Sequence, residues 1–161
     1  MELHLSFVIL TIILCVVVWQ DLKQRLIHVL LPILVFLTAV IINYLSEHLN
    51  FMMCLKNIGF VVINIIGVTL YFSFKNKSFV NPVDSMIGLG DILFFVAITP
   101  LFNLKSYILF FIVGMLFSLV IHIIVNAFKK QKTVPLAGYL ALFLIGTVFF
   151  ERVLNLNLII L

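Results

Sequence analysis

The stretch Tyr107–Phe128, YILFFIVGMLFSLVIHIIVNAF, decides the fold class, because it contains no charged residue over a length that can cross a membrane. A bilayer core about 30 Å thick requires about 20 helical residues per crossing. The run lacks the period-two alternation of apolar and polar residues that is typical of membrane β-barrels. A spanning segment must satisfy its backbone hydrogen bonds internally, so this run predicts a transmembrane helix.

The rest of the chain has the same character. Of its 161 residues, 65% are hydrophobic and only 10% are charged, a composition that indicates an integral membrane protein and excludes an ordinary soluble domain. Five further apolar runs are separable: Leu5–Val18, Leu26–Tyr44, Phe51–Phe74, Ile87–Phe102 and Val134–Phe150. We therefore expect an all-α membrane protein with one domain, residues 1–161, built as a bundle of six transmembrane helices.

The basic residues predict the orientation of this bundle. Seven of the ten fall in the first, third and fifth connections: Lys23, Arg25, Lys75, Lys77, Lys129, Lys130 and Lys132. Short loops rich in lysine and arginine stay in the cytoplasm. We expect these connections to be cytoplasmic, both termini to lie outside, and the protein to reside in the inner (cytoplasmic) membrane, where the lysines of the fifth connection meet anionic lipid.

Two carboxylates fall on this cytoplasmic side at helix ends. Asp21 follows the first apolar run, and Asp91 opens the fourth. Carboxylates at a low-dielectric boundary are costly when charged, and two that lie close together cannot easily both ionise. A charged and a neutral carboxyl group supply the general base and general acid of an aspartic protease. We predict that Asp21 and Asp91 form such a dyad.

Asp91 lies in the stretch SMIGLGDILFF, Ser85–Phe95, behind two glycines. Gly88 and Gly90 permit positive φ and allow another backbone, such as an extended substrate, to come close. The positive end of the helix dipole favours the ionised form of Asp91. The simpler alternatives are that Asp91 only caps its helix and that Asp21 is an interfacial acid paired with Lys23 or Arg25.

Three segments in this order carry a resemblance to a known family: DLKQRLI at Asp21–Ile27, GLGD at Gly88–Asp91 and VPLAGYLA at Val134–Ala141. They resemble the prepilin peptidases, the type IV leader peptidase family of GxGD membrane aspartic proteases, over almost the whole chain. The resemblance implies an endopeptidase that removes the basic leader of prepilins or pseudopilins at the cytoplasmic membrane face. It implies Asp21 and Asp91 as catalytic residues. Candidates for positioning the substrate are Gly88, Gly90, Arg25, Ile27, His28 and Pro135.

The chain departs from the usual family pattern at three places. Ile27-His28-Val29 stands where members commonly have Ile-Pro-Asn, Leu93 where they commonly have lysine, and Ala137-Gly138 where Gly-Pro is usual. These departures concern substrate positioning more than the dyad. Larger members resemble a two-activity enzyme with an N-terminal portion associated with methylation. Nothing in this chain corresponds to that portion, so we expect a peptidase without methyltransferase activity.

Other functions remain as alternatives. Intramembrane carboxylates and a short apolar segment interrupted by glycine also mark ion routes, so a small ion-coupled transporter or transporter subunit is the second hypothesis. A degenerate, non-catalytic family member is the third. The sequence has no CxxC pair, and we expect no metal, no cofactor and no nucleic-acid partner.

Overall fold

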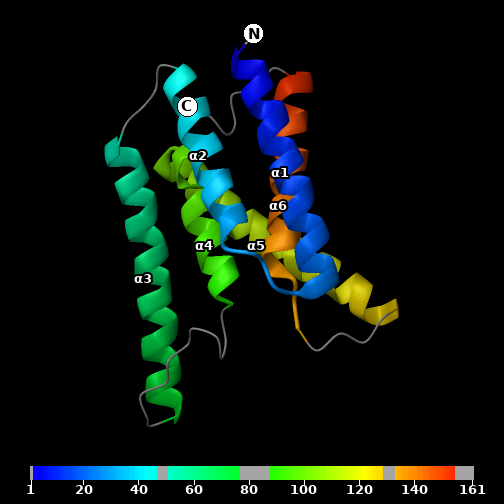
Figure 1. Cartoon of the computed structure of the whole chain (residues 1–161). Coiled ribbons are helices and arrows are strands. Elements are labelled where there is room, and N and C mark those ends of the chain that lie inside the picture. Colours follow the sequence, from blue (N-terminus) through cyan, green and yellow to red (C-terminus); the bar gives the residue numbers. More distant parts are fainter. Residues whose placement is uncertain (1, 47–50, 77–87, 129–132, 155–161) are drawn as a thin grey trace.

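The computed structural model describes residues 2–46, 51–76, 88–128 and 133–154. The elements in chain order are α1 (Glu2–Gln24), α2 (Leu30–Leu45), α3 (Phe51–Asn76), α4 (Leu89–Ala97), the 3₁₀ helix η1 (Thr99–Leu101), α5 (Leu104–Phe128) and α6 (Leu136–Leu154) (Figure 1). No β-strand occurs in these ranges. The all-α prediction is confirmed for this part of the chain.

The helices differ in how far they could extend through a bilayer. Helices α1, α3 and α5 are long and apolar enough to cross a membrane, whereas α2, α6 and the combined segment Leu89–Leu101 are shorter apolar helices. Many large apolar side chains are exposed on the outside of the bundle, as lipid contact requires. The protein is therefore a membrane protein, and crossing by the three shorter helices stays a prediction.

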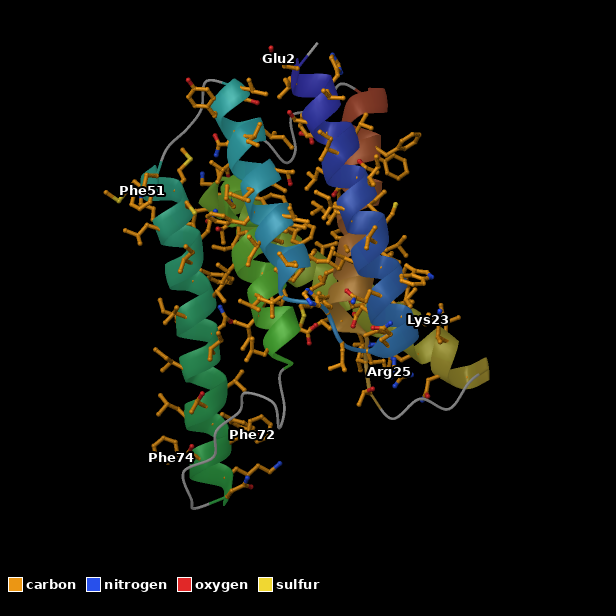
Figure 2. All side chains as sticks on the ribbon, in the orientation of Figure 1. Glu2, Lys23, Arg25, Phe51, Phe72 and Phe74 are labelled. Carbon is orange, nitrogen blue, oxygen red and sulfur yellow. The ribbon has the colours of Figure 1, made fainter. Side chains whose placement is uncertain are left out.

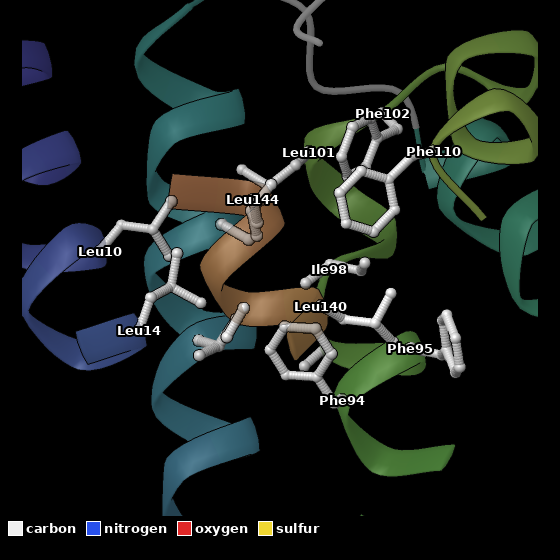
Figure 3. Close-up of a cluster of buried hydrophobic side chains, with 14 of the residues drawn as sticks. Leu10, Leu14, Phe94, Phe95, Ile98, Leu101, Phe102, Phe110, Leu140 and Leu144 are labelled. Carbon is white, nitrogen blue, oxygen red and sulfur yellow. The ribbon is translucent and has the colours of Figure 1, made fainter. Parts of the chain in front are cut away.

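The packing places the end of α1 beside the beginning of α6. Helix α1 packs against α2 and α6, α6 also packs against α5, and α2 packs against α4 and η1. The start of α1 and the end of α6 lie at the same end of the molecule, so these neighbouring helices run antiparallel (Figure 1). Figure 3 shows Leu10 and Leu14 of α1 directed toward α6, where Leu140 and Leu144 are fully buried. Apolar burial thus fixes how α1 and α6 meet.

Helix α3 lies at the side of the bundle and is attached through both apolar and polar side chains. Its two buried residues are Asn57 and Val61. The Asn57 side-chain amide donates hydrogen bonds to the carbonyl oxygens of Thr99, at 2.9 Å, and Phe102, at 2.8 Å. These carbonyls belong to the irregular backbone around η1, and in apolar surroundings such groups need a partner. Asn57 therefore stabilises both the helix break and the docking of α3.

We expect Asn57→Ala to lower the free energy of unfolding by about 1–3 kcal/mol, because it leaves two buried carbonyl groups without their donor. Thermal unfolding in detergent measures this change. Asn64→Ala is the matched control on the same helix, since the Asn64 amide bonds only the Phe60 carbonyl of its own helix at 2.8 Å. Equal losses in the two variants would contradict the role assigned to Asn57.

Candidate functional site

Asp21 lies within α1, one turn before the helix ends at Gln24, and not after the helix as the apolar run predicted. Its side chain is 5% exposed. The Oδ2 atom accepts a hydrogen bond of 2.6 Å from the backbone N–H of Gly138. Because the last turn of α1 lies beside the first turn of α6, the Asp21 carboxylate is buried between these two helices.

Asp91 lies in the first turn of α4, as the sequence predicted, and is half-buried. Its Oδ1 atom accepts a hydrogen bond of 2.9 Å from the backbone N–H of Ala137. The carboxylate also bonds the backbone of Gly88, the N-cap residue of α4. An acidic side chain that reaches back to the N-cap forms half of a capping box. Asp91 therefore caps its own helix and contacts α6 at the same time.

The two carboxylates meet at consecutive residues of α6. Ala137 and Gly138 are neighbours, and adjacent backbone nitrogens are roughly 3 Å apart, so the two bonded oxygens lie within about 9 Å of each other. The Asp21 charge also acts electrostatically on Asp91. The structure thus brings together two acids that are far apart in the sequence.

Helix α6 supplies both donors because they lie in its first turn. N–H groups in the first turn of a helix have no intrahelical acceptor, and the helix dipole makes this end positive. These donors stabilise negative charge on the pair, whereas the two acids repel each other when both are ionised. Among the described residues, no group of three metal-ligating side chains occurs. The arrangement is suited to proton transfer by two carboxyl groups.

The absence of a side chain at Gly138 allows this approach. A Cβ atom at Gly138 would lie 3.0 Å from Asp21 Oδ2 and 3.1 Å from Asp21 Cβ, which is tighter than ordinary packing.

The glycines of the GLGD stretch do not adopt the positive φ that glycine permits. Gly88 has φ −63°, and no described glycine has positive φ.

Ile27 and Pro135 border the two acids. The Ile27 side chain is partly buried, and a Cβ atom at Gly90 would lie 3.4 Å from Ile27 Cβ, which is ordinary contact. Ile27 therefore packs over the start of α4, one residue from Asp91. Pro135 is buried immediately before α6, and its carbonyl oxygen accepts the Tyr139 N–H at 3.2 Å.

His28 is exposed in the turn between α1 and α2. Its backbone N–H donates to Gln20 Oε1 at 3.1 Å, and its Nδ1 atom accepts the Leu30 N–H at 3.4 Å. The first bond joins His28 to α1 and the second lies within its own turn, and neither involves Asp21. A contact between His28 and a substrate stays a prediction.

Arg25 follows α1 and has φ 55°, in the left-handed region that costs a non-glycine residue about 1–2 kcal/mol. Its backbone N–H donates to the Asp21 carbonyl oxygen at 2.9 Å. Its Nη1 atom donates to the Thr133 carbonyl oxygen at 3.0 Å and to the Thr133 hydroxyl. The guanidinium group proposed to position substrate is therefore bonded within the protein.

Sequence reasoning missed the roles of Thr133, Ala137 and Gly138. Two of these residues act through backbone N–H groups, which every residue except proline has, so their side chains carry no signal of the role. The available signal was Pro135, which is typical of a helix start and therefore of unpaired N–H groups just after it.

Comparison with models of protein families matches residues 8–124 to the type IV leader peptidase family. The matched range is well over half of the chain and includes both Asp21 and Asp91, while α6 follows it. No curated protein and no solved structure matches the chain. On the strength of the family match, the chain belongs to the type IV leader peptidase family.

Proposed function

We propose that this protein is a membrane aspartic endopeptidase that removes the basic leader from prepilins or pseudopilins, with Asp21 and Asp91 as its catalytic dyad. The observation that carries the proposal is the convergence of both carboxylates on the adjacent N–H groups of Gly138 and Ala137. Family membership supports it, because it implies a protease of this type.

The proposed reaction uses the two acids as a pair that shares one proton. The ionised carboxylate takes a proton from water, and the water oxygen attacks the carbonyl carbon of the scissile peptide bond. The protonated carboxyl group donates its proton to the carbonyl oxygen. The carboxyl group that took the water proton then donates it to the nitrogen, and the C–N bond breaks. The other carboxylate takes a proton from a hydroxyl group of the intermediate, which releases the two products and restores the pair. The acid and base roles belong to the pair and not to one residue.

The distribution of charge supports an active site at the cytoplasmic membrane face. Lys23 and Arg25 lie at the same end of the molecule as Phe72 and Phe74, whereas Glu2 lies at the opposite end (Figure 2). Lys75 is in the last turn of α3, at this same basic end. Basic ends face the cytoplasm. In the inner membrane the dyad would meet a substrate where its basic leader joins its apolar helix.

Cleavage by the purified protein tests the proposal. Reconstituted in liposomes, the protein should cut a prepilin-like peptide once, between a basic leader and a following hydrophobic helix, and mass spectrometry would identify the two products. An inserted, folded protein that leaves such peptides intact would contradict the proposal and favour a non-catalytic family member.

A further inference from the structure

Arg25 combines an unusual backbone with a position next to the dyad. It is the only non-glycine residue with positive φ among those that the structure describes. Such residues are rare and persist where tertiary contacts hold them. Arg25 comes four residues after Asp21, and its N–H bonds the Asp21 carbonyl oxygen. The residue with the unusual backbone, Arg25, therefore directly follows the helical turn that carries Asp21.

The Arg25 side chain connects this end of α1 to the segment that leads into α6. Its guanidinium group donates hydrogen bonds to the carbonyl oxygen and to the hydroxyl of Thr133. Thr133 comes four residues before Ala137, the donor to Asp91. The positive charge of Arg25 also acts favourably on the Asp21 carboxylate. The bonds between Arg25 and Thr133 thus connect α1, which carries Asp21, to α6, which supplies both N–H donors.

We propose that Arg25 is a positioning residue, which holds Thr133 so that the first turn of α6 presents its N–H groups to Asp21 and Asp91. Without this link, the packing of Leu10 and Leu14 against α6 would still hold the helices together nearer their other ends. The first turn of α6 would then be free to shift relative to the acids. The expected effect on cleavage rests on the proposed function, whereas the effect on the start of α6 does not.

Arg25→Gln and Lys23→Gln form a matched pair, since each removes one positive charge from the same end of α1. The Lys23 ammonium lies over the ring of Trp19 in its own helix, 4.8 Å from the centroid. We expect Arg25→Gln to lower kcat roughly tenfold to a hundredfold with KM changed less than about threefold, because small misplacements of catalytic groups are costly. Lys23→Gln should change kcat less than about twofold, since its contacts are local.

Two further variants test whether the link to Thr133 is responsible. Arg25→Lys should recover part of the lost kcat, because an ammonium group can bond Thr133 but lacks the planar fork of arginine. Thr133→Val should lower kcat less than Arg25→Gln, because the carbonyl acceptor remains. Combined with Arg25→Gln, it should cause no further loss, as expected for two residues that act through one contact.

Hydrogen exchange of the backbone amides provides a readout that does not need activity. In Arg25→Gln, the amides of Ala137 and Gly138 should exchange roughly tenfold faster than in the wild type, because the bonds that protect them open more often. Lys23→Gln should leave their exchange unchanged. Faster exchange in a protein that cleaves no prepilin-like peptide would support the positioning role while contradicting the proposed peptidase.

Two results would overturn the inference. The first is that Arg25→Gln matches Lys23→Gln in both kcat and amide exchange. The second is a higher KM with unchanged kcat and unchanged exchange, which would show that Arg25 contacts the substrate. Cleavage by the wild type together with either result would leave the proposed function intact.

Discussion

Asp21→Asn and Asp91→Asn should each lower the rate of leader cleavage by at least about a thousandfold, because each removes one of the two carboxyl groups proposed to transfer protons. Asparagine keeps a side-chain carbonyl oxygen in nearly the same place. That oxygen can still accept the Gly138 N–H at position 21 or the Ala137 N–H at position 91, so the fold should persist. Initial rates with a prepilin-like peptide, measured beside the unfolding temperature of each variant, test this expectation.

Glu2→Gln is the control for the loss of a carboxylate. Glu2 is exposed at the end of the molecule opposite Lys23 and Arg25 (Figure 2). Its replacement should leave the cleavage rate within about twofold of the wild type, as expected for an exposed surface substitution away from the site. A folded Asp21→Asn or Asp91→Asn variant that cleaves at a rate near that of Glu2→Gln would reject the dyad mechanism.

The apolar runs predicted the helices better than they predicted the helix ends. The run beginning at Phe51 starts where α3 starts, but α1 continues six residues past Val18, through a mostly polar stretch, to Gln24. Hydropathy reports which residues suit lipid, whereas a helix continues as long as its backbone bonds are favourable. For this reason the apolar run predicted that Asp21 follows the first helix, whereas Asp21 lies within α1.

The fourth run shows a different limit of the pattern. Ile87–Phe102 was counted as one apolar run, yet the described part divides into α4 and η1 around Ile98. Pro100 lacks an N–H group and disfavours helical geometry in the residue before it, which accounts for the break. The carbonyls left near the break are bonded by Asn57 and by Asn43, which donates to the Pro100 carbonyl oxygen at 2.7 Å. Those partners come from other helices, so the local sequence gave no indication of them.

The candidate site was predictable where its chemistry lies in side chains. Asp21 and Asp91 stand out because carboxylates are rare in so apolar a chain. The donors that bond these carboxylates do not stand out, because nearly every residue has a backbone N–H group and the sequence does not show which of them are used. The departure at Gly138 from the usual Gly-Pro pattern was assigned to substrate positioning. In the structure, Gly138 donates an N–H that proline does not have.

Gly138→Ala should lower the cleavage rate roughly a hundredfold, because the added methyl group displaces Asp21 and misplacement by about 1 Å can cost that much. The new Cβ would lie 3.0 Å from Oδ2 and 3.1 Å from Cβ of Asp21. A change of rotamer would move only the carboxylate end of Asp21 and would not relieve the contact with its Cβ, so α1 and α6 must separate. Steady-state kinetics with a prepilin-like peptide measures the loss.

Gly146→Ala on the same helix is the matched control. A Cβ atom at Gly146 would meet nothing within 4 Å, and alanine is favoured over glycine within a helix by about 0.5–1 kcal/mol. This variant should therefore keep its activity and be at least as stable as the wild type. Gly138→Ala should retain a cooperative unfolding transition while losing activity, because the strain is confined to the meeting point of α1 and α6. If both alanine variants cleave equally well, the close approach of Gly138 to Asp21 is not needed to assemble the dyad.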